Sequence, residues 1–172
     1  MKAPTAQFLC KLTDNKHGLS FGGFRIRDMT SGLTLIEVKD EDINKENLGD
    51  SADDMKKRVL KYHLGPDFLL LKTVGLTMTF SNTGEEPIKH MLMIERHYFR
   101  EKVLRSYEFE FGFVMPKSTN SWEFIYDLPE LTEAEKLEII AAPWEVKSDS
   151  FFLIDGVIEI HNRAEYNYAP LI

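Results

Sequence analysis

Side chains that could act as acids, bases, nucleophiles or metal ligands are scattered along the sequence. The single cysteine, Cys10, has no second thiol to join it at a metal, and no two histidines show a metal-binding spacing. The histidines are His17, His63, His90, His97 and His161. No G-x-x-x-x-G-K phosphate-binding loop is present, and no G-x-S-x-G nucleophile elbow is expected. These residues predict no enzyme, no metal centre and no cofactor.

Four aromatic residues occupy alternate positions and could form a binding surface. Tyr107, Phe109, Phe111 and Phe113 stand at every second position, which places them on one face of a β-strand. Such a row usually fills the core of a β-sandwich, but it can also wall a cavity between two sheets. Because periodicity reports the direction of side chains and not the space in front of them, both interpretations remain open.

Glu95 and Tyr62 are the polar residues whose positions suggest contact with a ligand. In the alternating run of residues 88–100, Glu95 shares a face with Met91 and Met93. A carboxylate that points inward needs hydrogen-bond donors, so Glu95 lies either on an exposed part of this face or at the mouth of a pocket. The hydroxyl of Tyr62 could bind the polar end of a ligand, although a tyrosine satisfied within the core is the commoner case.

The elements that must position these residues are mostly short strands. Polar or glycine-containing turns separate the runs of β-forming residues, and the Asp155-Gly156 pair predicts a tight hairpin. One helix is expected at residues 131–141, where Thr132 is the N-cap and Glu135 completes a capping box. Residues 68–71 form either a helical turn or a buried strand. The predicted strands cover residues 21–27, 33–38, 59–64, 73–80, 88–100, 107–113, 150–154 and 157–161.

The length and composition predict one globular domain. The chain has 172 residues, of which 43% are hydrophobic and 28% charged. Many short strands and one isolated helix favour an all-β fold, an immunoglobulin-like antiparallel β-sandwich. We expect residues 1–20 to be a partly mobile N-terminal segment and residues 21–172 to form the sandwich. Within it, residues 39–58 are nearly devoid of large apolar side chains, which predicts a mobile loop.

Charge and hydropathy argue against nucleic acid as a partner and against insertion into a membrane. The net charge of −7 argues against nucleic acid, since proteins that bind it gather positive charge against the phosphate backbone. No apolar run approaches the roughly 20 residues that cross a bilayer, so no stable membrane insertion is predicted. With one cysteine and no signal-peptide pattern at the start, we expect a cytoplasmic protein.

Several segments together resemble one family of lipid-binding chaperones, the uncoordinated one-nineteen family. They include Met-Ile-Glu-Arg-His-Tyr-Phe-Arg at residues 93–100 and Ser-Asp-Ser-Phe-Phe at residues 148–152. The others are residues 24–29, 109–113 and 125–127. The family is similar in fold to the delta subunit of retinal phosphodiesterase and to the Rho GDP-dissociation inhibitor, which implies a lipid-binding cavity between two sheets.

The resemblance implies a carrier for N-myristoylated proteins, such as G-protein alpha subunits or ciliary proteins. Such a carrier shields the acylated N-terminus from membranes and delivers it, by resemblance, to the cilium or flagellum. A GTP-bound small GTPase of the ADP-ribosylation-factor-like group would release the cargo. Tyr62 and Glu95 match positions that hold the entering peptide at the pocket mouth. The resemblance gives the pocket lining as Phe24, Phe68, Tyr107, Phe109, Phe111, Phe113, Tyr126 and Phe152.

Two alternatives remain beside the acyl carrier. Residues 111–122 are also similar to the prenyl-binding delta subunit, which keeps a prenyl-protein solubilising factor open, whereas residues 93–100 and 148–152 favour acyl cargo. A plain interaction module with a dry core and an exposed edge strand is the third possibility. The sequence also departs from the family, with Leu128 where phenylalanine is common, Phe124 where histidine occurs and Phe152 where tyrosine is common. These departures leave pocket length and cargo preference open.

Overall fold

The computed structural model describes residues 3–42 and 58–171. Most of the predicted loop at residues 39–58 lies outside the described residues; its beginning forms a short 3₁₀ turn, η2 (Asp40–Asp42). Among the described residues, no helix has the length and apolar character needed to cross a membrane.

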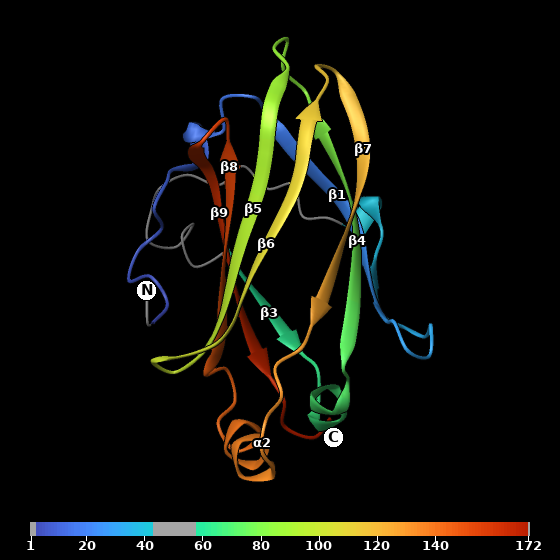
Figure 1. Ribbon diagram of the computed structural model, residues 1–172, viewed down its shortest axis with the longest axis vertical. Helices are drawn as coiled ribbons and strands as arrows, with labels where there is room; N and C mark the ends of the chain where they lie inside the picture. Colours follow the sequence, from blue (N-terminus) through green and yellow to red (C-terminus); the bar gives the residue numbers. More distant parts are fainter. Residues whose placement is uncertain (1–2, 43–57, 172) are drawn as a thin grey trace.

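Two β-sheets pack face to face, which confirms the predicted all-β, immunoglobulin-like sandwich (Figure 1). The four-stranded sheet has the order β2 (Thr34–Val38), β1 (Leu19–Asp28), β4 (Thr73–Asn82) and β7 (Ser118–Asp127). The five-stranded sheet has the order β3 (Val59–His63), β9 (Val157–Asn167), β8 (Val146–Ile154), β5 (Ile88–Phe99) and β6 (Lys102–Val114). One pair departs from the expected antiparallel pattern, because β3 runs parallel to β9.

Local sequence signals account for the turns and the helix. The hairpin of β1 and β2 is antiparallel, as its polar turn predicts. Asp155 and Gly156 adopt positive φ values of 50° and 85° and join β8 to β9, the conformation of a type I′ turn. Helix α2 (Glu133–Ile140) begins with the expected capping box, in which Thr132 accepts from the backbone N–H of Glu135.

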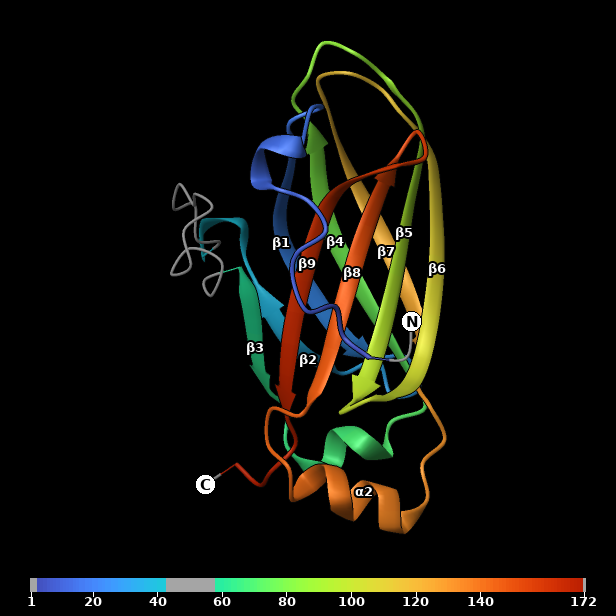
Figure 2. The ribbon, with the colours of Figure 1, turned by 90° about the vertical axis from the view of Figure 1, so that its left-hand side faces the viewer.

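Three short 3₁₀ helices complete the described chain: η1 (Leu12–Asp14), η2 and η3 (Pro66–Leu70). The last one settles the two possibilities at residues 68–71 in favour of a helical turn. It lies beside α2 at one end of the sandwich (Figure 2).

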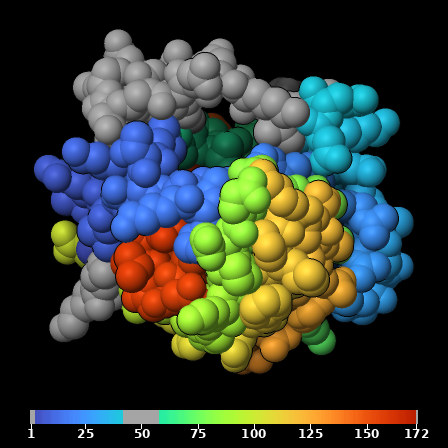
Figure 3. Space-filling model, turned by 90° about the horizontal axis from the view of Figure 1, so that it is seen from above, coloured from blue at the N-terminus to red at the C-terminus, as the bar shows by residue number. Residues whose placement is uncertain are grey.

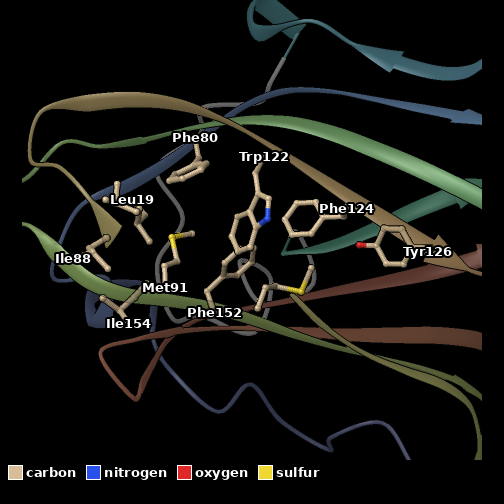
Figure 4. Packing of buried hydrophobic residues seen from close by; sticks show 11 residues of the cluster. Leu19, Phe80, Ile88, Met91, Trp122, Phe124, Tyr126, Phe152 and Ile154 are labelled. Atoms are coloured by element: carbon tan, nitrogen blue, oxygen red, sulfur yellow. The ribbon is translucent and has the colours of Figure 1, made fainter. Parts of the chain in front are cut away.

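The hydrophobic core fills the half of the sandwich that lies farther from α2. Leu19, Phe80, Ile88 and Met91 lie close together there, beside Trp122, whereas Tyr126 lies farther along the sandwich (Figure 4). The β4–β5 and β6–β7 turns close this end, and the N-terminal residues lie next to the β8–β9 turn (Figure 3). The other half, nearer α2, encloses a cavity between the sheets.

A β-bulge in β6 changes which residues of that strand point inward. Gly112 has a φ of 91°, and the pairing with β5 shifts between Met91↔Gly112 and Leu92↔Glu110. Beyond the bulge Val114 is 1% exposed, while Phe113 is 58% exposed. Phe113 therefore lies on the surface and not in the predicted aromatic row, because the extra residue moves it to the other face of the strand.

Candidate functional site

A cavity of about 640 Å³ lies between the two sheets, in the half nearer α2. Its size falls within the range of about 300–1,000 Å³ that is usual for small-molecule sites. Both sheets supply its walls: Phe24 and Leu76 come from one, and Met93 and Phe152 from the other. The edge strands β2 and β3 contribute Val38 and Leu60.

The inner end of the cavity is apolar. Phe21 and Phe152 meet across the two sheets with ring centres 4.9 Å apart. Met78, Met93 and Phe124 complete this end, which borders the packed core at Trp122. A hydrocarbon chain placed here would contact carbon atoms of the lining.

The outer end of the cavity, beside α2, is also apolar. Ile139 of α2 packs with Phe99, Val146 and Tyr168, and Phe68 of η3 packs against the same cluster. Ile139 and Phe68 both line the cavity, so the two short helices close this end of the sandwich.

A polar band separates the two apolar ends. Glu95 lies in it with a side chain only 12% exposed. His97 Nε2 lies 2.8 Å from Glu95 Oε2, and Ser150 Oγ donates to Oε1 over 2.5 Å. The sheet register explains this grouping, because Glu95 pairs with Ser150 on β8 and with Tyr107 on β6. Glu95 therefore points inward and not to an exposed part of the strand face, and it has the donors that a buried carboxylate needs.

Opposing effects act on the charge of Glu95. Burial alone would raise the pKa of its carboxyl, but the hydrogen bond and charge of His97, with hydrogen bonds from Ser150 and Tyr126, outweigh burial. The pKa therefore lies below its usual value. Glu95 is an ionised acceptor at neutral pH and can receive N–H donors from a ligand.

Tyrosine side chains line the cavity near this carboxylate. Burial, with a smaller effect of the Glu95 charge, raises the pKa of Tyr62 to about 12. Burial also raises the pKa of Tyr107 to about 12 and that of Tyr126 well above its usual value. Tyr62 stacks on Tyr166, with ring centres 5.6 Å apart, as their pairing across β3 and β9 requires. These phenols stay neutral at neutral pH. The Tyr107 hydroxyl donates to the backbone carbonyl of Asp127 over 2.9 Å, and that of Tyr126 bonds to Glu95.

The structure brings together most of the residues predicted for the site. The cavity is lined by Phe24, Tyr62, Phe68, Glu95, Tyr107, Tyr126 and Phe152. Phe109 and Phe111 pack against the hydrophobic core and do not line the cavity: Phe109 lies 5.1 Å from Phe124 and Phe111 lies 5.2 Å from Trp122, measured between ring centres. Phe113 lies outside the site. The three positions that depart from the family, Leu128, Phe124 and Phe152, all line the cavity.

Sequence reasoning missed several polar residues of the site. His97, Ser148, Ser150 and Tyr166 all line the cavity, and the Tyr166 hydroxyl lies 2.9 Å from Ser148 Oγ. The period-two pattern that pointed to Glu95 also includes His97. The serines stand two residues apart in Ser148-Asp149-Ser150, a spacing that places both on one strand face.

The described residues include neither a nucleophile elbow nor a cluster of metal-binding side chains. Residues 18–22 match the G-x-S-x-G pattern, but they lie at the start of β1, where Ser20 pairs with Ser81, and not at a strand-to-helix turn. Within residues 3–42 and 58–171, no three His, Cys, Asp or Glu side chains are grouped so that they could hold a metal ion.

Comparisons with known proteins agree with this geometry. The family model described as "GMP-PDE, delta subunit" matches residues 13–168. Human protein unc-119 homolog B is 40% identical over 169 residues, which cover 95% of this chain and 67% of the relative. Protein unc-119 of Caenorhabditis elegans is 41% identical over 165 residues, covering 95% and 74%. The Drosophila melanogaster unc-119 homolog is 38% identical over 181 residues, covering 95% and 68%.

Proposed function

Since this chain belongs to the GMP-PDE delta-subunit family, and within it to the unc-119 proteins, we propose that it carries N-myristoylated proteins with their acyl chain in the cavity between its sheets. The family supports a lipid-binding carrier and a binding role over catalysis. The observation that carries the proposal is an apolar cavity of about 640 Å³ with one polar band around Glu95.

Burial of the acyl chain supplies the driving force for binding. At about 0.8 kcal/mol per methylene, a dozen methylenes give on the order of 10 kcal/mol before ordering costs. A single myristoyl chain binds a bilayer only marginally, so a protein cavity can compete with the membrane for it.

The polar band supports a ligand with a peptide attached to its hydrocarbon. An N-myristoylated protein presents an amide directly after the acyl chain. The Glu95 carboxylate can accept its N–H, and the neutral hydroxyl of Tyr62 can donate to a carbonyl oxygen. A free hydrocarbon offers no N–H or C=O group to this band, whereas an acylated peptide offers both, which favours the acylated peptide.

Delivery and release complete the proposal. The cargo would be G-protein alpha subunits or ciliary proteins, delivered to the cilium or flagellum. A GTP-bound GTPase of the ADP-ribosylation-factor-like group would release it, and for this the GTPase must bind the cargo-free state more tightly than the loaded one.

A fluorescence-polarisation titration with three forms of one glycine-initiated peptide tests the proposal. The forms are N-myristoylated, unmodified, and farnesylated at the C-terminal end. We expect tight binding of the myristoylated form alone. Preference for the farnesylated form would indicate a prenyl-protein solubilising factor instead of an acyl carrier. No binding of any form would favour a plain interaction module.

A further inference from the structure

A charged cluster is buried on the outer face of the five-stranded sheet, on the side opposite the cavity. Asp149 of β8 is 1% exposed and His161 of β9 is 0% exposed. His161 Nε2 lies 2.7 Å from Asp149 Oδ1, and Arg163 Nε donates to the same oxygen over 3.0 Å. A carboxylate on an outer sheet face is this deeply buried only when another segment covers it.

The covering segment is the N-terminal strap, which we define as residues 3–18. It crosses the outer face of β9 and β8 (Figure 2). The backbone N–H of Thr5 donates to Asp149 Oδ2 over 2.9 Å, and that of Leu9 donates to His161 Nδ1 over 3.0 Å. The ring of Phe8 lies edge-on to that of His161, with ring centres 5.1 Å apart. The guanidinium carbon of Arg163 lies 5.2 Å from the centre of the Phe8 ring.

The strap is attached through side chains and adds no strand to the sheet over the described residues. Its only regular element over these residues is η1, and hydrogen bonds from its backbone to the side chains of Asp149 and His161 take the place of strand pairing. Because Nδ1 of His161 accepts from Leu9, the ring proton sits on Nε2 and points to Asp149. At its other end His17 Nδ1 lies 3.2 Å from Glu159 on β9. Such an attachment can detach as a unit without breaking a β-ladder.

The cluster beneath the strap is continuous with the cavity wall. Ser148 and Ser150, the neighbours of Asp149, face the cavity, and Ser150 donates to Glu95. Arg163 pairs with Asp149 across β8 and β9 and also lines the cavity. It contacts the strap as well, through a 2.5 Å bond from its guanidinium to Thr5 Oγ1. One pair of strands therefore carries both the strap contacts and the donor that orients Glu95.

We propose that the N-terminal strap is a latch: docked on Asp149 and His161, it holds β8 and β9 in the geometry that retains the ligand, and its detachment speeds ligand release. The inference rests on the proposed lipid-binding function of the cavity. Detachment does not strand a buried charge, because water then reaches Asp149, so the detached state is accessible to the folded protein. A partner that binds the freed strap or the exposed sheet face would thereby promote release.

Two kinds of variant test the latch. The pair Thr5→Val and Phe8→Ala weakens the strap without altering the sheet, and deletion of residues 1–10 removes its first half, which holds the contacts to Asp149 and His161. Gln7→Ala, at an exposed position between the two, is the matched control. The probe is a fluorescent, myristoylated, glycine-initiated peptide, and the readouts are its dissociation rate and amide hydrogen exchange of residues 148–152 and 160–164.

We expect the Thr5/Phe8 variant and the deletion to release the peptide roughly fivefold faster or more, the lower end of ordinary coupling between sites. Exchange of residues 148–152 and 160–164 should accelerate, with Gln7→Ala unchanged in both readouts. Unchanged release and exchange in the Thr5/Phe8 variant would overturn the latch, as would equal acceleration by Gln7→Ala.

The same experiment separates the latch from the proposed function. If the wild-type protein fails to bind the myristoylated peptide, the acyl-carrier function fails, and hydrogen exchange alone judges whether the strap holds β8 and β9. If the wild type binds and the strap variants release at its rate, the carrier function stands and the latch fails.

Discussion

Glu95 is a carboxylate held inside a largely apolar cavity by donors from neighbouring side chains. His97 and Ser150 occupy its two oxygens, and the low pKa keeps it ionised. A buried carboxylate is costly unless its hydrogen bonds are satisfied. The presence of Glu95 in a largely apolar cavity therefore favours a role in binding the polar part of the ligand.

Replacing Glu95 by glutamine should weaken binding of the myristoylated peptide. Hydrogen bonds to charged groups contribute about 1.5–3 kcal/mol, so the dissociation constant should rise roughly tenfold or more. Glu108→Gln, at an exposed position on β6, should leave it unchanged. Polarisation titration of both variants measures the difference, and equal affinities would remove Glu95 from the peptide contact.

Glu95 should also contribute to the pH dependence of stability. A carboxyl with a depressed folded-state pKa stabilises the fold above its unfolded pKa of about 4.3, and this contribution disappears as the pH falls through the folded pKa. Between neutral pH and this acid range, Glu95→Gln should therefore lose less free energy of unfolding than the wild type. Urea unfolding at several pH values measures this; a parallel decline in both proteins would contradict it. Asp149, whose pKa is also depressed, acts equally in both and cancels.

At the scale of elements, signals confined to a few neighbouring residues were predictable from the sequence. The capping box at Thr132 and the Asp155-Gly156 turn depend on local hydrogen bonds and backbone conformation, and both are confirmed. The bulge at Gly112 depends on the register against β5, which no period-two pattern contains.

Distance along the chain limited the remaining predictions. The parallel partner of β3 and the burial of Asp149 beneath the strap join segments far apart in the sequence, so no local pattern reveals them. In the same way, the alternation of β5 indicated the direction of Glu95, but its partner Ser150 comes from another strand. The sequence thus predicted which strand faces are apolar. It did not predict the cavity between them, because the cavity depends on how the two sheets pack.

The bulge in β6 makes Phe109 and Phe113 unequal although they stand in the same row of the sequence. Phe113→Ser should change the free energy of unfolding by no more than about 0.5 kcal/mol, because the ring is mostly exposed. Phe109→Ala should cost about 3 kcal/mol, because Phe109 packs against Phe124 and Tyr126. Chemical denaturation measures both values. Similar costs for the two would mean that the row continues inward past Gly112.

At the scale of the whole molecule, the sandwich is packed in one half and hollow in the other. Phe80, Met91 and Trp122 fill the first half, so stability can come largely from there while the second half stays open for a ligand. The boundary between the halves sets the depth that a hydrocarbon chain can reach.

Peptides whose acyl chains increase stepwise in length should reveal this boundary. Affinity should rise by about 0.8 kcal/mol per methylene, roughly fourfold in the dissociation constant, until the chain reaches the packed half. Met78→Trp, in the cavity wall, should move this limit to shorter chains, whereas Met115→Trp on the surface should not. Titration of the peptide series checks both; an unchanged limit in Met78→Trp would place the chain elsewhere.

The order in which the two sheets can be completed follows from the strand topology. The four-stranded sheet uses only residues up to Asp127, whereas the five-stranded sheet needs β8 and β9, and β3 must wait for a partner about 100 residues later. During synthesis at the ribosome, one wall of the cavity can therefore form early, and the other only when the C-terminal strands emerge. The cavity between the sheets therefore cannot be enclosed before β9 has left the ribosome.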